Sequence, residues 1–269
     1  MVADGLYDPL RHGCPKPDIL LAQHIAPFRA GTVSTRRGVI APSVDSFTVT
    51  LRGKGSHAAQ PHLAIDPVVL ASYIVVRLQG IVSREVKPGD LALVTVGSIQ
   101  AGSVGNIIPE FATMKVTIRT GVPEIRERLV SSFKRITRAE CEASGAPEPE
   151  FEPGRPAPFT INDEDVTKSI EESFATHFPK DRYMNPGLPL FGSEDFANLA
   201  IPLGAPYCYW TIGCIDPKVW DQAERTERTA EIPINHSPFF APAIQPTLET
   251  GVDAVVIALL TFLGAPEKI

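Results

Sequence analysis

The sequence predicts an α/β domain that is interrupted by a smaller inserted α+β domain. Between residues 44 and 153 the apolar pattern follows the order strand, helix, strand, strand, helix, strand, which is the split βαβ order of ferredoxin-like domains. Buried-strand and helix patterns occur on both sides of it and suit one domain that the chain leaves and re-enters. We therefore expect an outer domain from residues 1–42 and 155–269, with an inserted domain at 43–154.

The first outer segment contains two predicted strands. Residues Ile19–His24 are apolar and end at Gln23-His24, which is typical of a buried strand that closes on polar residues. A second short strand is expected around Gly31–Thr35.

The inserted domain opens with strict alternation, because Phe47, Val49 and Leu51 are separated by polar residues. Asp66 then offers a helix N-cap and Pro67 occupies the first helical position. The remaining elements are expected as a helix over Val68–Ile81, strands at Leu91–Ile99 and Met114–Ile118, a helix from Glu124 to about Ala143 that Pro123 opens and Gly145 closes, and a strand at Pro149–Glu152.

The second outer segment alternates helices with one strand. Asn162 is expected to cap a helix that runs to about His177, and Ala205–Ile212 has the composition of a buried strand. Residues 215–235 are polar and irregular, so we expect an exposed loop there. Pro246 is expected to start a final apolar helix that ends near Gly264.

Composition excludes several classes of protein. The 269 residues are 43% hydrophobic and carry a formal net charge of −6, so the chain suits a globular fold and lacks the basic patch that nucleic-acid binding needs. No stretch predicts a signal peptide or a membrane span. Four cysteines without a CxxC pair indicate free thiols. These features predict a cytoplasmic protein without nucleic-acid or membrane partners.

Three of the six histidines stand where chemistry is plausible. His24 ends an apolar strand, the place where α/β folds present ligand-binding groups. His236 lies in NHSPFF, just after the irregular stretch. Two imidazoles can bind zinc, but a catalytic site usually needs about three protein ligands. His57 lies in the glycine-rich turn GKGSHAAQPH, where it could touch a substrate or serve as an ordinary loop residue.

Two further polar residues could hold a carboxylate. The side chain of Asn106, in GSVGNIIP, can donate and accept hydrogen bonds, although a turn asparagine is equally expected there. Arg119 ends a strand and needs an anionic partner, either a substrate carboxylate or an internal acid. No GxSxG, GxxxxGK[ST] or strand-following GxGxxG motif is present, so a serine hydrolase or nucleotide site is not indicated.

Five motifs together resemble one family. GKGSHAAQPHLAIDPV, GNIIPE, TIRT, GSEDF and NHSPFF occur in this order and spacing in the metal-dependent amidohydrolases and peptidases that include aminoacylase, carboxypeptidase G, hippurate hydrolase and the auxin-conjugate hydrolases. The hippurate branch is the most similar one. The resemblance implies hydrolysis of the amide bond of N-acyl amino acids, and it covers nearly the whole chain.

The resemblance also implies roles for both domains. The outer domain would bind two divalent metal ions, zinc or manganese, with His24 and His236 as two of the ligands. The inserted domain would be a lid and the surface of a homodimer, and its His57 would reach the substrate in the partner subunit's site. Asn106 and Arg119 would lie at the carboxylate end of the substrate, and Arg155 would be a further carboxylate ligand.

The chain departs from the family at its metal ligands. An HD-containing histidine motif and a central Glu-Glu pair, which would provide the general base, are expected before MVADGLYD and are not found. Glu171-Glu172 is a Glu-Glu pair on a predicted surface helix after the lid. We therefore expect an N-terminally truncated member that alone lacks a full ligand set. Two alternatives are a non-catalytic homologue that dimerises through its lid, and a module that binds a carboxylate without metal through Asn106, Arg119 and His57.

Overall fold

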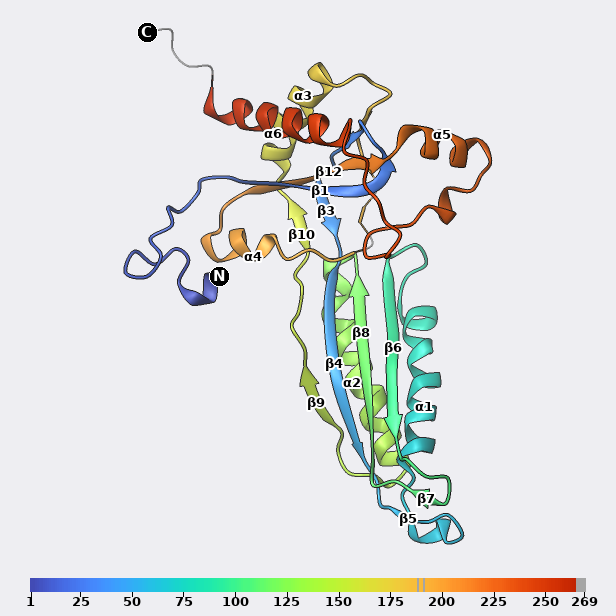
Figure 1. The fold of residues 1–269 in the computed structure, drawn as a ribbon. Coiled ribbons are helices and arrows are strands. Elements are labelled where there is room, and N and C mark those ends of the chain that lie inside the picture. Colours follow the sequence, from blue (N-terminus) through green and yellow to red (C-terminus); the bar gives the residue numbers. More distant parts are fainter. Residues whose placement is uncertain (188, 191, 265–269) are drawn as a thin grey trace. The chain divides into compact units, whose positions relative to one another are not determined.

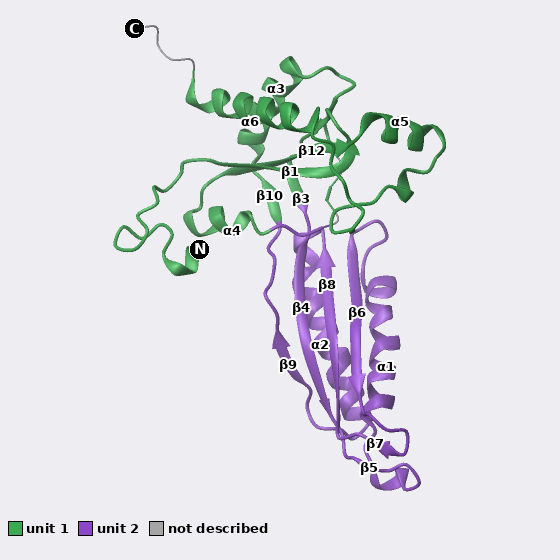
Figure 2. Ribbon diagram, viewed as in Figure 1, with its two compact units in different colours: residues 1–40, 160–190, 195–269 green, residues 41–159, 191–194 purple. Residues whose placement is uncertain are grey.

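The computed structural model describes residues 1–187, 189–190 and 192–264, which form two compact units (Figure 2). Unit 1 contains Met1–Ile40, Thr160–Leu190 and Asp195–Ile269, and unit 2 contains Ala41–Phe159 with Phe191–Glu194. The segment that we expected to be inserted, 43–154, lies inside unit 2. Unit 1 has an α/β fold and unit 2 has an α+β fold.

Unit 2 is built on an antiparallel four-stranded sheet with the order β6-β8-β4-β9 (Figure 1). The first and third strands in the sequence are neighbours at its centre, which is the arrangement of a split βαβ domain. Phe47, Val49 and Leu51 are buried on one face, as their alternation predicts. The strands are β4 (Ser43–Arg52), β6 (Ala92–Ala101), β8 (Phe111–Thr120) and β9 (Glu150–Pro153).

Two helices pack on that buried face. Helix α1 (Pro67–Gly80) begins at the predicted cap, because the Asp66 carboxylate accepts hydrogen bonds from the backbone N–H groups of Val68 and Val69. A π-helical turn at Ile81–Glu85 extends it. Helix α2 (Arg126–Ala143) follows a 3₁₀ turn at Pro123–Ile125. Leu70, Ile74 and Leu78 of α1 join Leu129, Phe133 and Ile136 of α2 in one core with the sheet.

Helix α1 together with its extension is long and apolar enough to cross a membrane. Among the described residues, no other helix meets these criteria of length and composition. Its mean hydropathy over Pro67–Glu85 is 1.2, and one third of that window is buried. The buried positions are those that pack on the sheet, so the apolar character of this face is explained by the core.

One end of the unit 2 sheet carries a small second ladder. Strand β5 (Ser56–His57) pairs with β7 (Ile107–Ile108), and a 3₁₀ turn at Pro61–Leu63 follows β5. The backbone N–H of Ala58 donates to the carbonyl of Asn106 at 3.0 Å, which continues the pairing by one residue. The loops of unit 2 that contain His57 and Asn106 are therefore held together at this end.

Unit 1 contains a mixed sheet with the order β1-β12-β2-β11. Strand β1 pairs in parallel with β12, β12 pairs antiparallel with β2, and β2 pairs in parallel with β11. All nine residues of β12 are buried, as expected for the centre of an α/β sheet. The strands are β1 (Leu20–Arg29), β2 (Val33–Ser34), β11 (Tyr183–Met184) and β12 (Tyr207–Ile215).

Helices cover both faces of this sheet. Helices α3 (Glu164–His177) and α6 (Thr247–Leu263) pack against Cys208, Trp210 and Ile212 of β12. The short helix α4 (Ala197–Ala200) packs against Tyr207 on the opposite face and precedes a 3₁₀ turn at Ile201–Leu203. Unit 1 also contains a 3₁₀ turn at Val2–Asp4 and strand β10 (Thr160–Asn162), which pairs with β3 (Gly38–Ala41).

Three sequence expectations in unit 1 are wrong. The cap of α3 is Asp163, whereas Asn162 is buried in β10 and bonds the carbonyls of Arg36 and Tyr209. Glu171 lies on the buried side of α3 with a side chain that is 4% exposed. The stretch 215–235 is not a loop, because it forms helix α5 (Pro217–Arg225) and a 3₁₀ turn at Thr229–Glu231.

Candidate metal and substrate residues

His24 is exposed on β1, and one of its ring nitrogens makes a hydrogen bond within the chain. Its Nδ1 lies 2.6 Å from the carbonyl oxygen of Ile25. A carbonyl can only accept, so Nδ1 carries the proton and the neutral ring leaves a lone pair on Nε2. Histidines that ligate metals usually have this arrangement, in which the second ring nitrogen donates to a carbonyl or carboxylate.

His236 lies next to a residue that bonds the same carbonyl. The side-chain amide of Asn235 donates to the Ile25 oxygen at 3.3 Å, so the segment that carries His236 meets the strand that carries His24. His236 itself has φ +70°, a left-handed conformation that is uncommon outside glycine. Such conformations persist where the surroundings fix them, and they are frequent at functional sites. The two predicted metal ligands thus share one anchoring point.

These donors fall short of a complete catalytic metal site. Neutral imidazoles suit zinc, manganese and similar ions, but about three protein ligands are usual. Among residues 1–187, 189–190 and 192–264, no group of three His, Cys, Asp or Glu side chains is placed to hold one ion. We therefore derive no reaction step through a metal from this chain.

The buried thiols are unsuited to nucleophilic chemistry. Burial raises the pKa of Cys208 to about 12 and that of Cys141 and Cys214 to about 11. A thiol attacks as the thiolate, which is scarce at neutral pH when the pKa is this high. Cys14 is exposed, and all four cysteines are free thiols, as the sequence predicts.

His57 is exposed on β5 and has the opposite ring arrangement to His24. Its Nδ1 accepts a hydrogen bond from the backbone N–H of Ala59 at 3.0 Å. The neutral ring therefore carries its proton on Nε2, which can donate to a ligand. This geometry suits stabilisation of a negatively charged oxygen and does not suit metal binding through Nδ1.

Arg119 is half-buried on β8, and its Nη1 donates to the Ser193 hydroxyl at 3.0 Å. Ser193 belongs to GSEDF, whose residues 192–194 lie in unit 2 with Arg119. The sequence indicated that Arg119 needs a partner but gave no sign that a hydroxyl 74 residues away would be one. Since the hydroxyl is neutral, this hydrogen bond does not neutralise the guanidinium charge.

The register of the sheet separates two groups of predicted substrate residues. His57 and Asn106 lie at the β5–β7 end, whereas Arg119 lies near the opposite end of β8. The strand between Phe111 and Arg119 spans roughly 27 Å at ~3.4 Å per residue. A carboxylate site made by all three residues of one chain is therefore excluded. Arg155 is exposed after β9 and joins neither group within the chain's described contacts.

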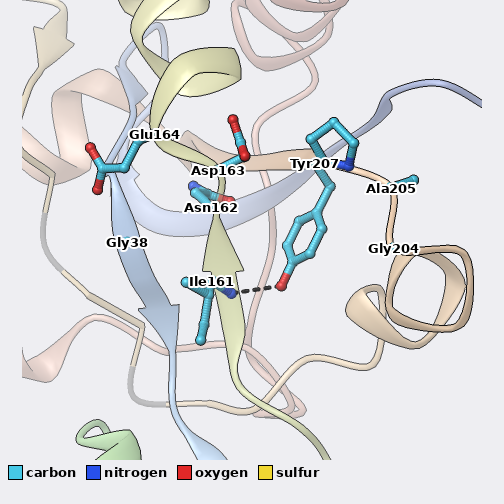
Figure 3. Close-up of a pocket in the computed structure, with 9 residues that line it drawn as sticks. Gly38, Ile161, Asn162, Asp163, Glu164, Gly204, Ala205 and Tyr207 are labelled. Carbon is cyan, nitrogen blue, oxygen red and sulfur yellow. Dashed lines mark hydrogen bonds between the residues drawn. The ribbon is translucent and has the colours of Figure 1, made fainter.

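A hollow at the surface of unit 1 lies away from these residues. A cavity of about 580 Å³ lies between the end of β10, the start of α3 and the loop before β12 (Figure 3). The Tyr207 hydroxyl accepts from the Ile161 N–H at 2.8 Å in its wall, and the Asp163 carboxylate is engaged in capping α3. None of the predicted site residues lines it, so we do not assign it to the reaction.

The chain is similar in sequence to one family model and to two enzymes of known name. A family model described as the peptidase dimerisation domain of the M20 type matches residues 42–144. An N-acetyldiaminopimelate deacetylase from Geobacillus sp. (strain WCH70) is 34% identical over 223 residues, covering 81% of this chain and 57% of the relative. The same enzyme from Bacillus cytotoxicus is 39% identical over 171 residues, covering 63% of this chain and 44% of the relative.

Solved structures show the same fold. An aminohydrolase from methicillin-resistant Staphylococcus aureus superposes with a TM-score of 0.76 at 22% identity, over 96% of this chain and 60% of that protein. A Bacillus subtilis dinuclear metal-binding peptidase of the M20 family superposes with a TM-score of 0.58 at 23% identity, over 79% of this chain and 56% of that protein. The chain thus spans about half to three fifths of the length of these relatives.

Proposed function

This chain belongs to the M20 family of metal-dependent amidohydrolases and peptidases, and on that premise we propose that it serves the hydrolysis of an amide bond in an N-acyl amino acid. The curated relatives are named as deacetylases of N-acetyldiaminopimelate, which favours a small acyl group on an amino acid with free carboxylates. Because the chain spans 57% and 44% of these enzymes, the activity is proposed for the complete catalytic unit.

The observation that carries the proposal is that the Ile25 carbonyl accepts hydrogen bonds from both the His24 ring and the Asn235 side-chain amide. This carbonyl fixes the tautomer that exposes Nε2 of His24 and brings the His236 segment to the same strand. We propose His24 and His236 as ligands of a divalent ion such as zinc or manganese. A bound ion of this kind activates water and polarises a carbonyl.

The inserted domain would supply the substrate contacts. His57 presents a donor on Nε2, which suits the oxyanion that forms when water adds to an amide carbonyl. Arg119, with Ser193 beside it, offers a cation and a hydroxyl for a substrate carboxylate. Asn106 adjoins His57 through the Ala58 N–H, and Arg155 is proposed as a second carboxylate ligand.

Two chains would be needed to combine these contacts. His57 and Arg119 lie near opposite ends of β8, so one site could use both only if a second copy supplied one of them. The matched dimerisation model over residues 42–144 supports such a pairing through unit 2. A truncated homologue that dimerises without catalysis remains the alternative, and it would not require metal binding at His24.

Zinc titration by calorimetry tests the metal assignment without relying on activity. We predict that His24→Ala and His236→Ala each weaken zinc binding by about 10-fold or more, since even second-layer partners of a metal ligand contribute 10- to 100-fold. His62→Ala, which changes an exposed histidine of unit 2, should leave the titration unchanged. Equal zinc affinity in the parent chain and both variants would refute the assignment and favour the non-catalytic homologue.

A further inference from the structure

A hollow on the helical face of unit 2 is lined by arginine side chains from two helices. It has a volume of about 570 Å³ and lies where helix α1, the π-helical turn at Ile81–Glu85 and helix α2 meet. Arg77 and Arg84 line it from the first helix and its extension, and Arg135 lines it from α2. A guanidinium group presents its N–H donors in a planar fork that suits the oxygen atoms of carboxylates and phosphates. The hollow is therefore a candidate site for an anion.

Two of these arginines have charges that the chain does not compensate. Arg77 and Arg84 make no ion pair with any acid among the described residues. The two helices and the π turn lie within residues 67–87 and 123–143, which contain eight Lys or Arg side chains and five Glu side chains. The chain as a whole has a formal net charge of −6. This local excess of positive charge in an acidic chain attracts small anions to the helical face.

Arg135 is held in place by a carboxylate on the π turn. Its Nη2 donates to Glu85 Oε1 at 2.9 Å, and the Ser132 hydroxyl donates to Glu85 Oε2 at 2.6 Å. The Ser132 hydroxyl and then the Arg135 guanidinium lower the pKa of Glu85, so this side chain is a carboxylate at neutral pH. A guanidinium group has five N–H donors and Arg135 uses one of them in this bond, so the others can bond a ligand.

The hollow is also lined by a glycine that the backbone does not require. Gly80 ends α1 with φ −66° and ψ −22°, a helical conformation that any residue can adopt. A Cβ added to Gly80 would meet no described heavy atom within 4 Å. Glycine is less favourable than alanine in a helix, and neither the backbone nor the packing explains its presence here. Its missing side chain leaves space in the hollow open to a ligand, and the π turn that follows is a feature frequent at functional sites.

We propose that this hollow binds a small polyanion with at least two negative charges, such as a phosphate ester or a polycarboxylate. Its oxygen atoms would accept hydrogen bonds from Arg77 and Arg84 on one side and from Arg135 on the other, so the ligand would connect α1 to α2. Glu85 and Glu140 also line the hollow, so several contacts with arginine are needed to offset their repulsion of an anion. The inference concerns unit 2 alone and does not depend on the proposed reaction.

Calorimetric titration of the full chain with citrate and with pyrophosphate tests the site. The buffer contains no divalent ions and about 0.15 M salt, which screens exposed charges more than about 8 Å apart. We expect saturable binding with one ligand per chain. Binding of both probes would identify the shared oxyanion chemistry, whereas binding of one alone would identify carboxylates or phosphates as the source.

Charge variants locate the bound anion. Arg77→Gln and Arg84→Gln should each weaken binding by about 10-fold or more, because each removes a charge-assisted contact. Arg138→Gln is the matched control, since Arg138 lies on α2 but pairs with Glu148 and does not line the hollow. This control should change the affinity by less than about 2-fold, because salt screens its exposed charge.

Two further variants separate a built site from a positively charged surface. Gly80→Leu fills space in the hollow and leaves every charge in place, so it should weaken binding by about 5-fold or more. Glu140→Gln removes a negative charge from the lining and should strengthen binding by about 2-fold or more.

Three outcomes would overturn the proposal. One is the absence of saturable binding by a chain that circular dichroism shows to be folded. The others are equal weakening by Arg84→Gln and Arg138→Gln, and unchanged affinity in Gly80→Leu. In these two cases the anion would be attracted by the surface charge in general and not held in the hollow.

Discussion

At the scale of single residues, Arg37 holds a buried carboxylate in unit 1. Its Nε donates to Glu171 Oε2 at 2.7 Å, and the two side chains are 42% and 4% exposed. Removing one partner of a buried pair costs about 3–5 kcal/mol, and the exposure of Arg37 reduces that cost. We predict that Arg37→Ala lowers the free energy of unfolding by about 2 kcal/mol in urea denaturation at neutral pH.

The exposed pair Arg228 and Glu231 provides the matched control. Their side chains are 65% and 60% exposed, so Arg228→Ala should change the free energy of unfolding by less than about 1 kcal/mol. Equal losses in the two variants would show that Glu171 is not held by Arg37. The sequence could not predict this pair, because helical periodicity says nothing of a partner 134 residues away.

The residue types of the candidate site come from the sequence, whereas their contacts come from the structure. Strand ends and glycine-rich turns pointed to His24 and His57, since these are the places where folds present functional groups. The ring tautomers depend on the Ile25 carbonyl and the Ala59 N–H, which only the folded backbone positions. Ser193 was missed for the same reason.

At the scale of elements, the crossing of β12 with the end of β1 depends on a glycine. A Cβ at Gly213 would lie 2.0 Å from the Arg29 carbonyl oxygen and 2.4 Å from Thr32 Oγ1. Neither backbone nor a short side chain can yield by the ångström or more that is needed. We predict that Gly213→Ala lowers the free energy of unfolding of unit 1 by about 3 kcal/mol or more, measured by urea denaturation.

Gly97 in β6 is the control for this substitution. It also lies in a strand, but an added Cβ would meet no described heavy atom within 4 Å. Gly97→Ala should therefore be neutral or slightly stabilising, by up to about 1 kcal/mol. Similar destabilisation at both positions would indicate loss of glycine's backbone freedom and not a steric clash.

Local patterns predicted elements well where apolar periodicity was strong, as in β4 and α1, and less well where it was weak. Helix α5 was missed because its stretch is polar, yet Asp216-Pro217 repeats the cap that located α1 at Asp66-Pro67, and the Asp216 carboxylate caps α5 in the same way. The cap of α3 was predicted one residue early. Both Asn162 and Asp163 are suitable N-cap residues, but Asn162 is buried in β10 and Asp163 forms the cap.

At the scale of the molecule, unit 2 has one face that a second copy could cover. Strand β6 is at the edge of its sheet, and the adjoining helix α1 exposes Val69 (50%), Tyr73 (62%) and Val76 (73%). Two copies that pair β6 antiparallel would place the Ala101 end of one strand beside the Ala92 end of the other. Since His57 lies at the first end and Arg119 at the second, the pairing would bring these two groups together across the interface.

We therefore predict that the chain is a dimer at micromolar concentration and that Val76→Asp makes it monomeric, measured by multi-angle light scattering. The charge would be placed in an apolar contact between two α1 helices, where it has no partner. Val219→Asp on α5 is the control, because it places the same charge on a comparably exposed site of unit 1. A parent chain that is monomeric, or a dimer that Val76→Asp leaves intact, would contradict pairing through β6 and α1. A monomeric parent chain would also leave His57 and Arg119 unable to act on one substrate, because the length of β8 keeps them apart within one chain.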